Sequence, residues 1–224
     1  ASQYAERNYF GKACGLLDQI ATGFGCISYI DFKDISNPEV INVKLSLDDV
    51  EFVIIETSGD HAKLSHLYEG IPNDMYKAAK ANGKEYLRDV DDFKEDNLNP
   101  NEIKKARHFY SENERVKQGL EAVKNDDSKT LIRLVNESSD SSRDNLENTR
   151  VNNEYQGSIQ EAIDIVRKIC PSSGVKVNGG GFKGTVISII PKNDFDKFMI
   201  DIKQYYDESK IHHVHIKKES VGII

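Results

Sequence analysis

Residues 175–190 carry the sequence VKVNGGGFKGTVISII, in which two apolar stretches flank a run of glycines. The stretches 175–177 and 185–190 have the apolar character of β-strands, and Pro191 ends the second. Glycines adopt backbone conformations that other residues avoid, so the loop suits close packing against a phosphate or another backbone. It is not followed by a helix at the spacing of a Walker A or dinucleotide-binding motif. By itself the segment predicts a hairpin-like connection.

The residues after this hairpin predict a helix over 194–206 and a final strand over 211–216. We expect this end of the chain to form a separate αβ unit. In the final strand, His213 and His215 share a face and follow His212. A surface strand is favoured over a metal site there, because the sequence places no third ligand or carboxylate beside them, and we expect no protein-bound metal.

The residues before the hairpin predict strands at 25–33, 39–46 and 51–57 and helices at 62–81, 102–124, from 126 onward and at 158–170. The strand 51–57 is the most continuously apolar and is interpreted as buried. The stretch 138–153, rich in Ser, Asp and Asn, is either a solvated helix end or a functional loop, and its composition leaves both open. This order of elements predicts an α+β fold with a mostly antiparallel sheet and helices packed on one side.

Composition limits the class of protein and of partner. The 224 residues carry a net charge of −7, which argues against binding to nucleic acid or to an anionic membrane, since both need clustered Lys and Arg. No apolar run reaches the roughly 20 residues of a transmembrane helix, and the N-terminus has no signal-peptide pattern. The cysteines Cys14, Cys26 and Cys170 have no CxxC spacing and predict reduced, buried thiols in a cytoplasmic protein.

A second segment with candidate binding and catalytic residues lies near the N-terminus, over residues 11–19. Gly15 lets the backbone approach a ligand, and Asp18 follows about one helical turn later, so that its carboxylate can face the same cleft. On general grounds, a carboxylate in a first helical turn is most often a cap or a partner of the helix dipole. Residues 1–6 already have a helical pattern without a start methionine or a cap, which predicts a chain cut inside an element.

The two glycine-containing segments, in this order, resemble the GHMP kinase superfamily and galactokinase in particular. The CGxxDQ pattern of that family is met by residues 14–19, and its GGGFGG pattern by residues 179–184, with Lys183 in place of a glycine. Two further family patterns lie between them, RxRH…EN and ESH…RDD, and they are matched in part by Arg107-His108 with Glu112-Asn113 and by Glu137-Ser138 with Arg143-Asp144. The resemblance covers nearly the whole chain.

The resemblance implies a GHMP-kinase C-terminal domain with a ferredoxin-like sheet over residues 25–224, and the boundary of the N-terminal half over residues 1–24. The GRVNLIGEHTDY and PxxxGLSSSAA segments of the family, which supply sugar and phosphate contacts, are absent from the sequence. We therefore expect a fragment that lacks the N-terminal half and is inactive alone. The apolar surface left uncovered, with Tyr4, Tyr9 and Phe10, predicts self-association.

The resemblance also implies roles for single residues. Asp18 would be the catalytic base for the C1 hydroxyl of the sugar, and Gly15 would contact the sugar through its backbone. Tyr68, at the H-x6-Y distance after His61, would hydrogen-bond a sugar hydroxyl. The loop glycines would brace the phosphate-binding loop of the other half: Gly179, Gly180, Gly181 and Gly184. ATP and Mg²⁺ would be bound mainly by that half.

The function implied for the full-length protein is that of an ATP-dependent galactose 1-kinase, with galactose as the sugar partner. Two alternatives stay open. One is a GHMP kinase for another hexose or an amino sugar. The other is a galactokinase-like sensor that binds sugar and nucleotide without catalysis. Retention of Asp18 favours an enzyme, and the state of the phosphate loop in the other half would separate these alternatives.

Overall fold

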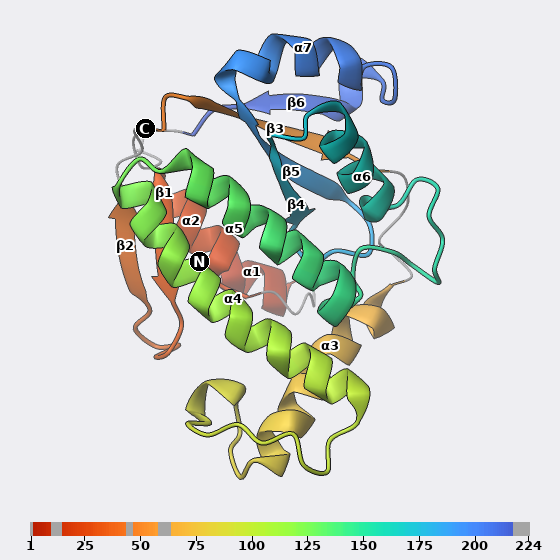
Figure 1. Ribbon diagram of the computed structural model, residues 1–224. Helices are drawn as coiled ribbons and strands as arrows, with labels where there is room; N and C mark the ends of the chain where they lie inside the picture. The colour runs from red at the N-terminus through yellow and green to blue at the C-terminus, as the bar shows by residue number, and fades with distance from the viewer. Residues whose placement is uncertain (1, 10–14, 44–46, 58–63, 217–224) are drawn as a thin grey trace.

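The computed structural model describes residues 2–9, 15–43, 47–57 and 64–216. Its helices are α1 (Ser2–Asn8), α2 (Leu17–Phe24), α3 (Ser65–Ala81), α4 (Pro100–Lys124), α5 (Ser128–Ser141), α6 (Ile159–Ile169) and α7 (Lys192–Ile202). Its strands are β1 (Ile27–Asp31), β2 (Glu39–Val43), β3 (Val50–Glu56), β4 (Gly174–Asn178), β5 (Thr185–Pro191) and β6 (Ile211–Val214) (Figure 1). The predicted elements are confirmed to within a few residues, except that α7 ends at Ile202 rather than at Tyr206. Residues 44–46 and 62–63, at the ends of a predicted strand and helix, lie outside the described residues.

Local sequence signals set the facing ends of α3 and α4. Asn99 caps α4, because its side chain accepts from the backbone N–H of Glu102 at 3.0 Å while the Glu102 carboxylate accepts from the Asn99 N–H at 3.0 Å. At the end of α3, Gly83 has a φ of 74° and the backbone N–H of Lys84 reaches the carbonyl of Ala79 at 3.0 Å. Both signals were readable in the sequence, as Asn99-Pro100 and Asn82-Gly83.

Four strands form the main sheet in the order β4-β5-β3-β6, and every neighbouring pair is antiparallel. This order corrects the expectation of a separate C-terminal unit, because β3 lies between β5 and β6 and pairs with both. The nearly continuous apolar sequence of β3 is buried best in a central position, where neighbouring elements cover it. The predicted α+β class with an antiparallel sheet is confirmed.

The main core lies between one face of this sheet and helices α6 and α7 (Figure 1). Side chains alternate along a strand, so Val53 and Ile55 of β3 and Val186 and Ile190 of β5 point to this face, where each is 0% exposed. Helix α6 covers them with the amphipathic set Ile159, Ala162, Ile163 and Val166. These inward positions follow the i, i+3, i+4, i+7 spacing of an amphipathic helix.

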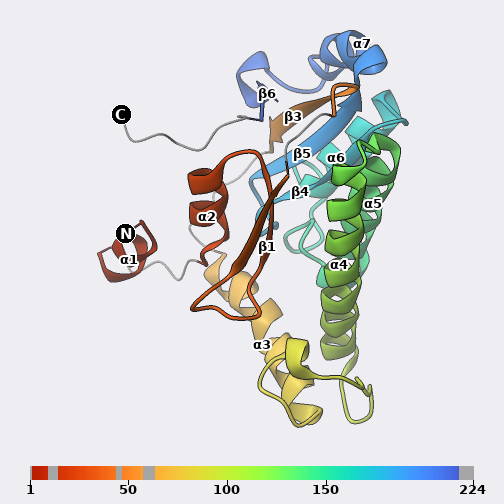
Figure 2. The ribbon, with the colours of Figure 1, turned by 90° about the vertical axis from the view of Figure 1, so that its left-hand side faces the viewer.

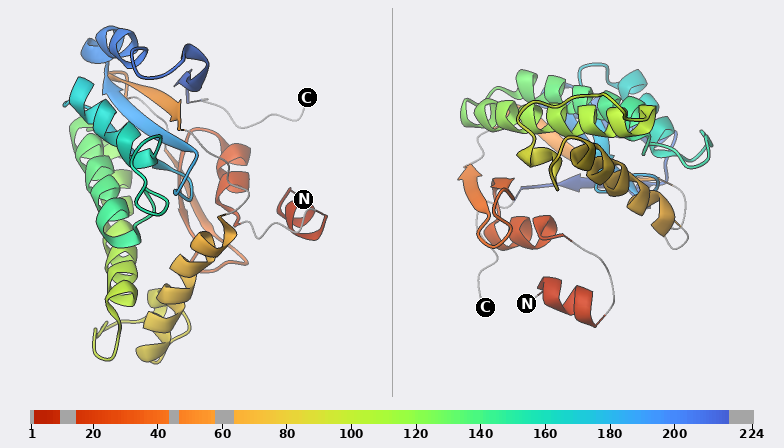
Figure 3. Two further views of the ribbon diagram at one scale, coloured as in Figure 1. Left: turned by 90° about the vertical axis from the view of Figure 1, so that its right-hand side faces the viewer. Right: turned by 90° about the horizontal axis from the view of Figure 1, so that it is seen from below.

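The opposite face contributes to a second apolar cluster, in which Phe52 and Ile189 meet α4, α5 and the β1–β2 hairpin. Helix α5 approaches β4 closely at Gly174, where a Cβ would lie 3.2 Å from the Cα of Ile132. In Figure 2 the β1–β2 hairpin lies between α2 and the α4–α5 pair. Helix α3 packs against α4 through a third cluster that includes Ala79 and Ala106 (Figure 3). Within the described residues, no helix combines the length and apolar composition that crossing a bilayer requires.

The burial of Phe198 in α7 predicts a large loss of stability when its ring is removed. The side chain is 1% exposed and belongs to the main core. Phe198→Ala should lower the free energy of unfolding by about 3–5 kcal/mol, because it removes buried apolar area and leaves a cavity. Ile200→Ala is the matched control in the same helix: Ile200 is 68% exposed, so we expect a change within about 0.5 kcal/mol. Urea unfolding measures both, and equal effects would contradict the assigned core.

Candidate functional site

A cleft of about 600 Å³ opens between the start of α2, the middle of α4, the segment after α5 and the β4–β5 loop. Its walls are formed by Gly15, Leu17, Asp18, Gln19, His108, Glu112, Ser142, Leu146, Asn148, Lys176, Val177, Asn178, Gly179, Gly180 and Ile187. The two glycine-containing motifs, which lie far apart in the sequence, therefore meet at one site. Of the residues singled out in the sequence, Gly15, Asp18, Gly179 and Gly180 line the cleft, whereas Tyr68, Gly181 and Gly184 do not.

Asp18 lies in the first turn of α2 and is exposed. The residue at the N-cap position is Leu16, and within the described residues no side chain caps this helix end. The carboxylate is therefore not used as a cap, although the helix dipole favours a negative charge in this turn. Next to it, the side-chain amide of Gln3 in α1 donates to the Gly15 carbonyl at 3.2 Å. Cys14 of the same motif lies outside the described residues.

The β4–β5 loop is a hairpin connection between antiparallel neighbours, and its glycines pack tightly against two other segments. At Gly180, a Cβ would lie 2.9 Å from the ring of Tyr68. At Gly181, where φ is 86°, a Cβ would lie 2.6 Å from the carbonyl oxygen of Asn148. Neither position has room for a side chain, and the second also needs a backbone conformation that favours glycine. The loop thus packs closely against neighbouring segments, one of them backbone, as its composition predicted.

Tyr68 in α3 holds this loop from one side. Its hydroxyl donates to the Gly181 carbonyl at 2.9 Å, and its ring meets Phe182 edge to face, with the ring centroids 5.3 Å apart. Burial raises the pKa of Tyr68 above its usual value, so the phenol stays a hydrogen-bond donor. Its contact with a sugar hydroxyl stays a prediction. His61, the other residue of the predicted pattern, lies outside the described residues.

The polar stretch 138–153 holds the loop from the other side. After α5 the chain makes a π-helical turn, Ser142–Leu146, and reaches Asn148, which is 4% exposed. The side-chain amide of Asn148 donates to the Gly180 carbonyl at 3.1 Å, and its backbone carbonyl accepts from the N–H of Phe182. Its Oδ1 atom is buried and has no hydrogen-bond partner among the described residues. The stretch is therefore a partly buried support of the cleft rather than a solvated helix end.

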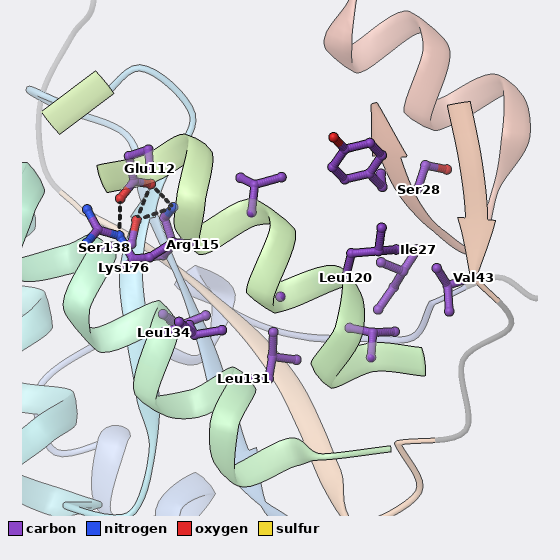
Figure 4. Close-up of a pocket in the computed structure, with 15 residues that line it drawn as sticks. Ile27, Ser28, Val43, Glu112, Arg115, Leu120, Leu131, Leu134, Ser138 and Lys176 are labelled. Atoms are coloured by element: carbon purple, nitrogen blue, oxygen red, sulfur yellow. Dashed lines mark hydrogen bonds and ion pairs between the residues drawn. The ribbon is translucent and has the colours of Figure 1, made fainter. Parts of the chain in front are cut away.

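A group of polar and charged side chains lies where α4, α5 and β4 meet, and we call it the cleft floor because two of its members, Glu112 and Lys176, line the cleft. The Glu112 carboxylate accepts from Arg115 at 2.6 Å and from the Ser138 hydroxyl at 2.7 Å. Lys176 donates to the same hydroxyl at 2.7 Å and lies 3.8 Å from Glu112. Figure 4 shows these four side chains together at the polar end of an adjoining, mostly apolar pocket of about 230 Å³.

Burial or neighbouring charges lower the pKa values of Glu112, Lys176 and the nearby His108. Burial acts to raise the pKa of Glu112, but Lys176, Ser138 and Arg115 outweigh it, and the pKa lies below its usual value. Burial lowers the pKa of Lys176, and Glu112 opposes that effect. Burial also lowers the pKa of His108 to about 4, so its ring is neutral at pH 7. Its Nδ1 atom lies 2.9 Å from the Ser141 hydroxyl.

Sequence reasoning missed Lys176 and Asn148 as cleft residues. A lysine between Val175 and Val177 was the available signal for the first, because alternate residues of a strand point to opposite faces. No comparable signal marked Asn148, whose place depends on how the chain turns after α5. His108 and Glu112 matched a family pattern without an assigned role.

Two of the described side chains that line the cleft carry carboxylates, Asp18 and Glu112, and Glu112 already accepts from Arg115 and Ser138. Magnesium prefers an octahedral shell of oxygen ligands. Among the described residues, no three His, Cys, Asp or Glu side chains converge in this cleft.

Comparisons with known proteins identify the fold first. No family model matches the chain. The crystal structure of Lactococcus lactis galactokinase complexed with galactose has a TM-score of 0.77 at 23% identity, and covers 99% of this chain and 59% of that one. Mevalonate diphosphate decarboxylase from Staphylococcus aureus has a TM-score of 0.57 at 11% identity and covers 88% of this chain and 54% of that one. The chain shares its overall fold with these two proteins.

Two curated proteins are similar to the chain in amino-acid sequence. Galactokinase of Haemophilus influenzae is 30% identical over 214 residues, which are 92% of this chain and 54% of that protein. Galactokinase of Thermotoga neapolitana is 32% identical over 213 residues, which are 92% of this chain and 58% of that protein. The chain is similar in sequence to these galactokinases, as its motifs indicated. It spans about half the length of these curated relatives.

The tight packing at Gly181 predicts that a single methyl group there is costly. Gly181→Ala forces alanine into a left-handed conformation against Asn148, and should lower the free energy of unfolding by at least about 1–3 kcal/mol. Gly119→Ala in α4 is the control, because nothing lies within 4 Å of a Cβ there. That substitution should raise stability by about 0.5–1 kcal/mol, as alanine favours a helix over glycine. Thermal or urea unfolding compares the two, and a neutral Gly181→Ala would disprove the packing.

The buried, neutral His108 predicts a pH dependence of stability. The unfolded chain takes up this proton near pH 6.5, whereas the folded chain does so only near pH 4. As the pH falls through this window the unfolded state binds more protons, so stability is lost, by up to about 3 kcal/mol. His108→Gln should flatten the curve of unfolding free energy against pH between these values.

The neighbours of His108 that influence its proton are Glu112, Arg115 and Lys176, and all three are kept in this variant. His212→Gln, which removes an exposed histidine outside the cleft, is the control and should change the slope less than His108→Gln does. Urea unfolding at several pH values measures all three chains. Identical slopes for the unsubstituted chain and His108→Gln would show that His108 is not buried in neutral form.

Proposed function

We propose that this chain is the base-bearing part of a sugar kinase that transfers the γ-phosphoryl group of ATP to the C1 hydroxyl of galactose. The observation that carries the proposal is the cleft that brings Asp18 together with the glycine loop, in a chain similar in sequence to galactokinases. The presence of galactose in the structurally similar Lactococcus lactis enzyme supports galactose as the sugar. The chain acts with a further segment of protein, and alone it is inactive.

In this proposal Asp18 accepts the proton of the attacking sugar hydroxyl. Its carboxylate is exposed at the cleft and is not engaged in capping α2, so it is available to a ligand. A positioned carboxylate takes up the proton as charge develops on the nucleophilic oxygen. Gly15 has no neighbouring heavy atom within 4 Å of a Cβ position, which leaves space for a sugar beside the backbone. Tyr68 and Asn148 position the glycine loop through their bonds to it.

ATP supplies the phosphoryl group when bound, and we propose that the further segment binds most of it together with Mg²⁺. Among the described residues, no three His, Cys, Asp or Glu side chains converge in the cleft, which supports this division of labour. The glycine loop, with Gly179, Gly180, Gly181 and Gly184, would act as a brace for the phosphate-binding part of that segment. Residues 1–24 would form the boundary between the two parts and residues 25–224 the C-terminal domain.

The alternatives have weaker support. The relatives with sequence similarity reported above are named galactokinases, which argues for galactose over another hexose or an amino sugar. A sensor without catalysis requires no free carboxylate at the sugar, whereas Asp18 is exposed at the cleft. Self-association of the chain alone stays a prediction, to which Tyr4 and Tyr9, 64% and 78% exposed, would contribute.

The role of Asp18 predicts the effect of a near-isosteric substitution in a protein that contains this chain and the further segment. Asp18→Asn keeps the shape of the side chain but removes the proton acceptor. Turnover of galactose with ATP should fall by about 10²–10⁴-fold, and KM for galactose should change much less. Steady-state formation of sugar phosphate measures both parameters.

Two controls complete this experiment. Asp92→Asn removes an exposed carboxylate that lies outside the cleft, and should leave turnover unchanged. The chain of 224 residues alone, with ATP, Mg²⁺ and galactose, should form no sugar phosphate above background. Normal turnover by Asp18→Asn would make Asp18 a structural residue, and activity of the chain alone would overturn the two-part proposal.

A further inference from the structure

His213 and His215 lie at the edge of the main sheet, on and just after strand β6 (Figure 1). Val53 of β3 is the register partner of His213. Because side chains alternate along a strand, His213 and His215 point to the same face as Val53, the face covered by α6 and α7. Both histidines are exposed at the rim of that face.

The neighbouring strand supplies a carboxylate at the same place. Glu51 lies two residues before Val53 on β3, so the antiparallel register puts it opposite His215 and diagonal to His213. Its Oε2 atom lies 2.9 Å from Nε2 of His213. No sequence pattern indicates that Glu51 is this partner, because Glu51 precedes His213 by 162 residues.

The three side chains already converge. One ligand atom from each of Glu51, His213 and His215 lies within 4.8 Å of the other two. The rings of His213 and His215 meet edge to face, with centroids 4.4 Å apart, and Phe195 of α7 packs on His213 at 4.6 Å. Metal–ligand bonds of zinc are about 2.0–2.2 Å long, so small side-chain rotations bring all three atoms onto one ion.

We propose that Glu51, His213 and His215 form a binding site for a divalent transition-metal ion, with Zn²⁺ as the best fit. Two imidazoles and one carboxylate suit zinc, whereas Mg²⁺ and Ca²⁺ prefer shells made of oxygen. Three protein ligands leave the fourth tetrahedral position to water. None of the three residues lines the cleft that contains Asp18, so the metal site is separate from the proposed kinase chemistry.

A metal ion at this site joins β6 to β3 beyond the end of their hydrogen-bonded ladder. The last register pair of the ladder on this side is Phe52 with Val214, and the ion links the next pair, Glu51 with His215. Within the part of the chain that the structure describes, strand β6 has β3 as its single neighbour in the sheet and pairs with it over a short stretch. Binding energy that is specific to the folded chain raises its stability. Zinc is therefore expected to stabilise the C-terminal edge of the sheet.

Calorimetric titration of the untagged, EDTA-treated chain with ZnCl₂ tests the site. We expect one ion to bind per folded chain with an affinity that depends on these three residues. With Zn²⁺ about 100-fold above its dissociation constant, the midpoint of thermal unfolding should rise by about 5 °C or more. His215→Gln and Glu51→Gln should each weaken binding at least about tenfold and remove most of that shift. MgCl₂ at the same concentration should give no shift.

The chain offers a matched control on the other face of the same strand. Nε2 of His212 lies 2.7 Å from Oε1 of Glu56, a similar His–Glu pair without a third ligand among the described residues. His212→Gln should therefore bind Zn²⁺ as tightly as the unsubstituted chain. Equally weakened Zn²⁺ binding in His212→Gln and His215→Gln would overturn the site. So would Zn²⁺ binding by His215→Gln or by Glu51→Gln that is as tight as in the unsubstituted chain. Circular dichroism confirms that each variant is folded before titration.

Discussion

The lack of side chains at Gly180 and Gly181 is the constraint on which the functional end of this molecule depends. A Cβ at either residue would overlap Tyr68 or Asn148. Only bare backbone lets the start of α3, the segment after α5 and the β4–β5 loop come into contact. Hydrogen bonds from Tyr68 and Asn148 to the loop carbonyls then hold the contact in place. The part of the cleft wall formed by Gly179 and Gly180 is positioned by these contacts.

The floor of the cleft follows from a second constraint, the cost of burying charge. Glu112 is compensated by Arg115 and Lys176, and the Ser138 hydroxyl bridges the carboxylate and the ammonium group. These side chains are half-buried, with 15% of Arg115, 23% of Glu112 and 32% of Lys176 exposed. Removing one partner leaves the others unpaired in a site that water reaches, so it should cost less than about 3–5 kcal/mol, the typical cost for a fully buried pair. The group ties α4, α5 and β4 together. It also places Glu112 and Lys176 in the lining of the cleft that contains Asp18.

The alternation of side chains along the sheet separates the two sites proposed for this chain. Lys176 and Ile187 are register partners and point to the face that lines the cleft. Val53 and His213 are register partners on the opposite face, where Glu51 and His215 join them. A sugar in the cleft and a metal ion at the edge of the sheet would thus lie on opposite faces. A substitution that disrupts one site therefore leaves the binding residues of the other site in place.

The sequence by itself determined the elements and their ends, because those depend on neighbours along the chain. The cap at Asn99, the stop at Gly83 and the inward positions of α6 are local signals, and each was readable. The motifs that contain Asp18 and the glycine loop were readable too, together with the similarity to galactokinases that they indicate.

Only the tertiary structure decided which of these pieces meet. The place of β3 between β5 and β6, the entry of Asn148 into the cleft wall and the partnership of Glu51 with His213 all join residues far apart in the sequence. Such contacts depend on how apolar faces are buried together and on the register of paired strands. A one-residue slip of register would turn every side chain of a strand to the other face. No local pattern specifies that choice, so the cleft floor and the metal ligands became visible only in the folded chain.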